Sequence, residues 1–339
     1  MSMTLGADAR DMDLASRHPR GTPVLPELNM RSLEDVLGPS AGRYFGHGYR
    51  GVRYGVKSSA CLDGDPSQVS AEVHATYPPH WSVDSDGTPR LPHLSSIDAT
   101  VLPLLAFEAA NGDRRNQLST RRVRVVELRA AGKPWLELDA IPVTLNVDVG
   151  HAGETLTSVV GNIRSRIVLT DGPHPAALFN ADVAPQYPLT VYGGLFQTGE
   201  CRSLVSTSEA LDGVLHGRHE FSVSEFAERP APGIEADFWP SPTVVDYLVT
   251  MGQLAQALIY ACGETDRSSI GTLWMRTMTL TIDEPSPQSP AAFETITRLV
   301  GDRILDRGGR RLHDLVIESS ATTGARVRAS LAYEEIGET

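Results

Sequence analysis

The strongest constraint on the fold of this chain is an internal repeat with a constant spacing of 148 residues. At this spacing short stretches match in pairs: Glu72-Val73 with Glu220-Phe221, Leu91-Pro92 with Trp239-Pro240, Ile97-Asp98 with Val245-Asp246, Glu108-Ala109 with Gln256-Ala257, and the strand-like residues 122–127 with 270–275. Few matched positions are identical, but element type, a proline and a helix-start aspartate recur without a gap. We therefore expect two copies of one structural unit.

Each copy reads as a few strands, a proline-rich loop, one hydrophobic helix and then further strands. The first helix is expected to begin near residue 96 with Ser95 or Ser96 as its cap, and Pro103 is expected to kink or shorten it. The second is expected over residues 244–263, with Gly263 at its end. A helix that is apolar nearly all round is buried, and an antiparallel sheet can wrap it.

These features predict an α+β fold of the double-hotdog type: two antiparallel sheets, each wrapping a central hydrophobic helix. The halves are expected to share one continuous sheet, because they repeat the same unit in one chain. A regular βαβ alternation is missing, so a doubly wound parallel sheet fits poorly. We assign residues 1–30 to an N-terminal arm, 31–185 to the first half and 186–339 to the second half.

Charge and cysteine content exclude several functions. The chain has 30 basic and 42 acidic residues, a net charge of −12, which argues against binding nucleic acid or an anionic membrane. Cys61, Cys201 and Cys262 are widely spaced and form neither a metal-binding pair nor a disulfide framework. No secretory signal and no membrane-spanning run is recognised. We expect a cytoplasmic protein without metal or cofactor.

The densest group of reactive side chains lies where the first proline-rich loop enters the helix, at residues 90–98. His93 can move a proton near neutral pH, and Asp98 could orient it or act as the base. Helix N-terminal amides can hold a thioester or enolate oxygen. Arg90, Ser95 and Ser96 are candidates for binding substrate. The alternative is purely structural: a serine cap, an acidic first turn and a loop histidine.

The counterpart in the second half, residues 241–246, keeps the aspartate as Asp246 but has no histidine. Such asymmetry is expected where two copies supply different groups to one site. Asp246 is thus a candidate acid or base, although it could also be only a helix N-terminal acid. Thr250 and Gln253 follow it by one and two turns and could reach the same cleft, with Trp239 in the cleft wall.

Double-hotdog dehydratases use a histidine from the first half and an aspartate from the second. Their histidine pattern has a glycine four residues on, where this chain has Ile97, and its proline comes one place late, at Pro103. The second pattern is echoed at residues 242–246, but Thr250 replaces the expected glutamine or histidine. The scaffold is compatible with this comparison, whereas ordinary dehydration is in doubt.

Other motifs carry weaker signals. Residues 42–50 are rich in glycine and contain His47 and two arginines, but they lack the context of a phosphate-binding loop, so a structural turn is favoured. His216 and His219 are three apart in a predicted strand and so face opposite ways, which disfavours a metal site. Trp81 and Trp274 are expected in the core or in the wall of a cleft.

Two stretches, residues 48–54 (GYRGVRY) and 77–99 (YPPHWSVDSDGTPRLPHLSSIDA), resemble the AvrD (avirulence D) proteins of bacteria, and more distantly the A-factor synthases. The resemblance is densest over residues 45–110. It implies a role in making acyl-sugar signals of the syringolide type, from a β-ketoacyl thioester and a sugar such as xylulose. It supplies no catalytic residues, so the roles of His93, Asp98 and Asp246 rest on the residue patterns alone.

The resulting hypothesis is an enzyme that joins a β-ketoacyl chain, taken from acyl-CoA or an acyl carrier protein, to a small sugar or polyol. One alternative is a dehydratase or isomerase of acyl thioesters. The other is a non-catalytic protein that binds acyl chains. A homodimer is left open.

Overall fold

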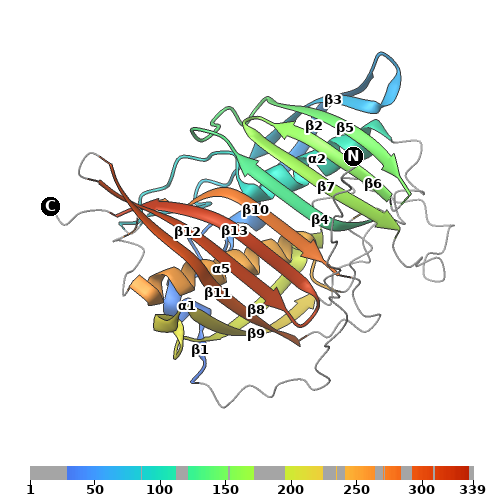
Figure 1. Cartoon of the computed structure of the whole chain (residues 1–339). Helices are drawn as coiled ribbons and strands as arrows, with labels where there is room; N and C mark the ends of the chain where they lie inside the picture. The colour runs from blue at the N-terminus through green and yellow to red at the C-terminus, as the bar shows by residue number, and fades with distance from the viewer. Residues whose placement is uncertain are drawn as a thin grey trace, which may run out of the picture.

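The computed structural model describes residues 29–84, 86–111, 121–151, 153–171, 195–223, 234, 241–263, 270, 272–283, 292–307 and 310–335. Within them the strands form one sheet of 13 strands, with two long helices on the same side of it (Figure 1). Nearly all of the expected N-terminal arm lies outside the described residues, as does Trp239.

The first half surrounds helix α2 (Ser96–Ala110) with six strands. In sheet order these are β4 (Arg121–Ala130), β7 (Ile163–Asp171), β6 (Gly153–Val160), β5 (Ile141–Gly150), β3 (Asp65–Thr76) and β2 (Arg53–Leu62). The helix contacts all six. Its residues from Ile97 to Glu108 are all buried, so it is enclosed on every side, as its all-round apolar sequence predicts.

The second half repeats this order around helix α5 (Val244–Gly263). Its strands, in sheet order, are β10 (Trp274–Ile282), β13 (Ala325–Glu334), β12 (Arg310–Ala321), β11 (Ala292–Arg307), β9 (Val214–Val223) and β8 (Gly199–Ser206). Short elements complete the described chain: β1 (Arg31–Ser32), α1 (Leu33–Leu37), η1 (Gly48–Gly51), α4 (Leu195–Thr198) and η3 (Ala210–Asp212). The expected duplication of one unit is therefore visible in the strand order itself.

Strands β4 and β10 join the halves. They pair in antiparallel fashion from Val125–Thr281 to Arg129–Thr277, so the sheet continues from one half into the other.

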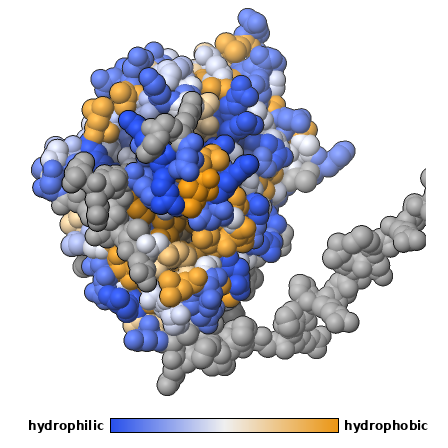
Figure 2. All heavy atoms as spheres, turned by 60° about the vertical axis from the view of Figure 1, so that its left-hand side comes forward, coloured by the Kyte–Doolittle hydropathy of each residue, from blue (hydrophilic) through white to orange (hydrophobic). Residues whose placement is uncertain are grey.

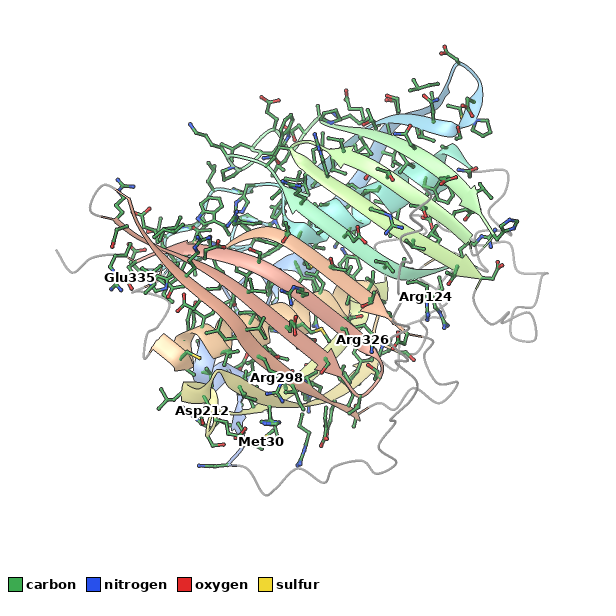
Figure 3. All side chains as sticks on the ribbon, viewed as in Figure 1. Met30, Arg124, Asp212, Arg298, Arg326 and Glu335 are labelled. Carbon is green, nitrogen blue, oxygen red and sulfur yellow. The ribbon has the colours of Figure 1, made fainter. Side chains whose placement is uncertain are left out.

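The outer face of this sheet, away from the helices, carries charged side chains such as Arg298 and Arg326 (Figure 3). Arg326 forms an ion pair with Asp283 across that face.

The repeat spacing of 148 holds for the helix starts and fails after the helices. Ser95 and Thr243, the cap residues of α2 and α5, are 148 residues apart. Strands β4 and β10 begin at Arg121 and Trp274, which are 153 residues apart. The expected match of residues 122–127 with 270–275 is thus wrong, because α5 has 20 residues and α2 has 15, which shifts the following strand by five positions.

The expected effect of Pro103 on the first helix needs correction. Helix α2 continues through Pro103 to Ala110 and is not shortened by it. Strands β6 and β7 are separated by a turn at Gly161, whose φ of 54° lies in the left-handed region that favours glycine.

The segment that begins at residue 31 lies with the second half and not with the first. β1 pairs with β8, and α1 contacts α5. Leu33 and Leu37 of α1 are buried in one cluster with Leu254 and Leu258 of α5. Apolar burial against α5 therefore decides where this segment packs.

Helix α5 is long and apolar enough to cross a membrane by length and composition alone, contrary to the expectation that the chain has no such run. In the structure 72% of its most apolar window is buried against the rest of the protein. It packs on β8, β9 and β11–β13, as the core helix of its half.

The inner face of the second half carries a buried histidine. His219 of β9 is fully buried, with its two ring nitrogens 2.8 Å from the hydroxyls of Ser203 and Thr295, and it stacks on Phe293. His216 faces the other side and lies 3.3 Å from Glu209, so the two histidines do not share a site, as expected from their spacing. Burial lowers the pKa of His219 to about 4.

This histidine predicts an acid-sensitive fold. In the unfolded chain its pKa returns to about 6.5, so between pH 6.5 and 4 the unfolded state binds more protons and stability falls as pH falls. We expect wild type to lose about 3 kcal/mol more than His219→Gln between pH 7 and pH 4 in denaturant unfolding. Equal losses in the two proteins would show that His219 is not held neutral by the fold.

Candidate functional site

A large cavity lies between helix α5, strands β10, β12 and β13, and the loops of the first half. Its volume is about 1280 Å³. Its floor is apolar and comes mainly from the second half: Leu248, Met251, Ala255, Ile259, Met278, Ile317, Val327, Ala329 and Leu331. Figure 2 shows one face of the molecule on which hydrophobic residues gather between hydrophilic ones. A cavity of this size and lining is suited to a long apolar chain.

The loop that enters α2 forms the polar side of this cavity. Arg90, His93, Ser95 and Ser96, all candidates from the sequence, line it. The glycine-rich segment contributes as well, because Arg43, Tyr44 and Phe45 also line the cavity. That segment is folded as turns and a 3-10 helix, as expected, and His47 lies 3.3 Å from the hydroxyl of Ser40.

His93 is held by its backbone neighbours. Its Nδ1 lies 3.3 Å from the carbonyl oxygen of Leu91, and its ring meets the Trp81 ring edge-on with 5.6 Å between centroids. A carbonyl only accepts hydrogen bonds, so Nδ1 carries the proton in this contact, and in the neutral imidazole Nε2 has the lone pair. The arrangement therefore presents Nε2 as a proton acceptor.

The N-terminus of α2 lies beside His93 at the cavity wall. Ser95 is the cap: its hydroxyl accepts a hydrogen bond from the Asp98 amide at 3.2 Å, and its amide donates to the Asp98 carboxylate at 2.7 Å. The first-turn amides of Ser96 and Ile97 have no acceptor within a helix. They can stabilise a negative oxygen placed at the wall that Ser95 and Ser96 form.

Asp98 lies in the cap of α2 and does not belong to the cavity lining. Its side chain is fully buried and accepts hydrogen bonds from Tyr54, Tyr77 and the Ser95 amide. Burial raises its pKa, and these hydrogen bonds oppose the rise. It does not line the cavity, and the His93 ring is oriented by the Leu91 carbonyl instead. Asp98 acts as the anchor of the helix start.

Asp246 is the equivalent residue of α5. Its carboxylate accepts hydrogen bonds from the amide and the hydroxyl of Thr243, at 2.8 and 2.7 Å. It is buried and does not line the cavity, so the structure does not bring it into that space with His93. Thr250 and Gln253 also point elsewhere: Thr250 donates to the Cys201 sulfur at 3.6 Å, and Gln253 accepts from Arg43 at 3.1 Å.

The two aspartates have unequal surroundings. Tyr54, which donates to Asp98 at 2.8 Å, pairs with Ala75 of β3. At the repeat spacing Ala75 corresponds to Val223 of β9, whose partner is Gly199. A Cβ on Gly199 would lie 3.5 Å from Oδ1 of Asp246. The strand position that places the Tyr54 hydroxyl beside Asp98 is therefore occupied in the second half by a glycine. That glycine offers Asp246 no side chain.

Nearby groups respond to the Asp246 charge. Burial first, and then the negative charge of Asp246, raises the pKa of Tyr49 to about 12. Burial likewise raises the pKa of the Cys201 thiol to about 11, with a smaller contribution from Asp246. Cys201 is therefore a neutral thiol at physiological pH and no ready nucleophile.

Among the described residues no group of histidine, cysteine and carboxylate side chains could hold a metal ion.

Sequence reasoning missed the aromatic support of this site. Tyr44, Tyr77 and Trp81 pack together beside the helix start, and Tyr44 lies 2.6 Å from the Ser95 hydroxyl. The same Tyr77 hydroxyl lies 3.1 Å from the His93 carbonyl oxygen. A signal was present, since Tyr54 and Tyr77 stand in the stretches that resemble AvrD, but nothing in their spacing relates them to Asp98.

The hydrogen bond between Tyr54 and Asp98 predicts a measurable coupling. Tyr54→Phe leaves one oxygen of a buried carboxylate without its donor and should lower the free energy of unfolding by about 1–3 kcal/mol. In Asp98→Asn the same tyrosine change should cost much less, with an interaction energy of about 1 kcal/mol or more in a double-mutant cycle. Strictly additive losses in denaturant unfolding would contradict the arrangement.

Comparison with solved structures finds distant likenesses. These include the tesB protein MAP1729c of Mycobacterium avium subsp. paratuberculosis (12% identity, TM-score 0.39, 81% of this chain and 94% of that one). A hot dog fold protein of unknown function from Alicyclobacillus acidocaldarius has 11% identity and a TM-score of 0.40, over 84% and 97% of the chains. The dehydratase domain of PpsC from Mycobacterium tuberculosis, in complex with C12:1-CoA, has 11% identity and a TM-score of 0.35, over 83% and 98%.

None of the curated proteins compared with the chain matches it. A protein-family model does match, over residues 28–334, and thus includes both halves of the sheet and both helix starts. The chain belongs to the Pseudomonas avirulence D protein (AvrD) family.

Proposed function

We propose that this protein is a biosynthetic enzyme that joins a β-ketoacyl chain, taken from a thioester, to a small sugar or polyol. The observation that carries the proposal is the apolar cavity of about 1280 Å³, with His93 and the N-terminus of α2 at its wall. The architecture we propose for it is the double hotdog, with halves that meet near residue 185 and with α1 assigned to the second half. The product would be an acyl-sugar or lactone signal, made in the cytoplasm.

The acyl chain would lie along the floor of the cavity. Met251, Ala255 and Ile259 repeat at helical spacing on one face of α5, opposite Ala329 and Leu331 of β13. Burying a chain there removes apolar surface from water, at about 0.8 kcal/mol for each methylene. The thioester would then sit at the polar wall, close to His93.

His93 would act as the base. Nε2 takes the proton of an acceptor hydroxyl, and the hydroxyl oxygen attacks the thioester carbon. The carbonyl oxygen becomes negative in the tetrahedral intermediate, where the Ser96 and Ile97 amides can donate to it. The carbon–sulfur bond then breaks, and the leaving thiolate takes the proton back from the imidazolium. Bonds, protons and charge balance without a cofactor.

Membership of the AvrD family supports this reading, since the resemblance implies acyl-sugar synthesis. The placement of Asp246 disfavours the alternative of dehydration, in which a histidine and an aspartate face one substrate, because Asp246 does not line the cavity. The second alternative is a protein that binds acyl chains without catalysis. The presence of His93 and of a helix N-terminus at the cavity wall favours an enzyme over a simple binder.

Replacing His93 tests the mechanism. We expect His93→Ala to lower kcat by about 10²–10⁴-fold for product formation from a β-ketoacyl thioester and a sugar, since the proton acceptor is lost. His80→Ala is the matched control, because His80 is exposed in the same loop and does not line the cavity. The same assay with Asp246→Asn reports whether Asp246 contributes to product formation.

Full product formation by His93→Ala would refute the proposed role of His93. Conversion of a 3-hydroxyacyl thioester to an enoyl product would indicate the dehydratase. A bound lipid without turnover of any thioester would indicate the binding protein.

Filling the cavity should change the accepted chain length. Ala329 lies on β13 at the cavity floor and is buried, so Ala329→Phe places an aromatic ring where the distal part of the chain would lie. We expect kcat/KM for a ten-carbon substrate to fall at least tenfold while a four-carbon substrate keeps most of its rate. Equal losses for both lengths in a normally folded variant would place the chain elsewhere.

A further inference from the structure

The mouth of the cavity exposes large apolar side chains. Leu91, Leu136 and Trp274 are 69%, 53% and 41% exposed, and all three belong to the cavity lining. They come from the loop before α2, the connection after β4, and the start of β10. Contiguous apolar surface next to a pocket marks an interaction site more often than a single exposed leucine does.

The same mouth is cationic in an acidic protein. The described lining contains Arg43, Arg90, Arg129, Lys133 and Arg276, against Asp84 and Asp86, in a chain with a net charge of −12. Arg43 is buried, and Arg276 forms an ion pair with Asp314 at 2.8 Å. The two aspartates accept hydrogen bonds from the Thr88 amide within their own turn.

The remaining cations stay available. Within the part of the chain that the structure describes, the side chains of Arg90, Arg129 and Lys133 form no ion pair. Arg129 and Lys133 are exposed. Arg129 lies opposite Thr277 on the seam between β4 and β10, so this cation of the first half stands at the border with the second half.

We propose that this rim, defined as Leu91, Leu136 and Trp274 with Arg90, Arg129 and Lys133, docks an acidic acyl carrier protein whose acyl-phosphopantetheine arm enters the cavity. The inference rests on the proposed function and names the thioester that this site uses. Charge complementarity would steer an acidic partner to this cationic opening and raise its association rate. The exposed leucines and tryptophan would then be covered by the protein partner, whereas a free coenzyme would leave most of them in water.

A charge-reversal experiment tests the docking surface. The same β-ketoacyl group is offered on an acyl carrier protein, on coenzyme A and on N-acetylcysteamine, each with the sugar acceptor. We expect Arg129→Glu with Lys133→Glu to raise KM for the carrier-protein substrate at least tenfold with kcat within twofold, and to change the N-acetylcysteamine reaction less than twofold. Leu136→Ser should raise the same KM by several-fold without a change of charge.

Arg202→Glu serves as the control. Arg202 is 78% exposed on β8 and does not line the cavity, so its reversal changes net charge without touching the rim. It should leave KM for the carrier-protein substrate within twofold of wild type. Salt should weaken the wild-type reaction with the carrier protein and have little effect on that of the double variant.

Direct binding separates this inference from the proposed function. Calorimetry with an acyl carrier protein that bears a non-hydrolysable acyl analogue should show binding to wild type and to Arg202→Glu, and at least tenfold weaker binding to the double variant. Binding without any turnover would contradict the function but keep the docking surface. Equal losses with coenzyme A and carrier protein would overturn the docking surface and assign the cations to a phosphate of the free thioester. No effect on any thioester would also overturn it.

Discussion

The whole structure depends on the burial of two helices that are apolar on nearly every side. α2 has no polar face to turn toward water, since Ile97 through Glu108 are all buried, and one sheet has to curve around it. The pairing of β4 with β10 then fuses two such wrapped helices into one sheet. If β4 and β10 did not pair, each would be an edge strand with unpaired backbone N–H and C=O groups in the middle of the molecule. Their pairing satisfies these groups in both halves.

The seam also creates the site. Because the halves meet edge to edge, the loops at the start of α2 lie against the flank of α5 and the strands beside it. The cavity takes its apolar floor from the second half and its reactive wall from the first. Neither half alone would enclose it. Under the proposed function, the second half would hold the acyl chain and the first half would supply the reacting groups.

Duplication left the same capping arrangement at both helix starts and then changed its surroundings. Asp98 and Asp246 each accept a hydrogen bond from the amide of their cap residue. The first is enclosed by tyrosine hydroxyls, whereas Gly199 stands in the second half at the position of Tyr54. A buried carboxylate is costly unless it is well supplied with hydrogen bonds, so the tyrosines stabilise the loop that carries His93. The Tyr77 hydroxyl, which reaches both Asp98 and the His93 carbonyl, connects the two.

The sequence by itself determined the repeated order of elements, the two buried helices and the aspartates at their starts, because these depend on local periodicity, capping and composition. It could not give the roles of the aspartates, since the tyrosines around Asp98 come from β2 and from the loop after β3 and meet it only on folding. It could not give the packing of α1 either, because Leu33 and Leu37 are buried against α5, which lies far away along the chain. The cationic rim was equally hidden: Arg90 lies far in sequence from Arg129 and Lys133, and only the folded chain brings them to one opening.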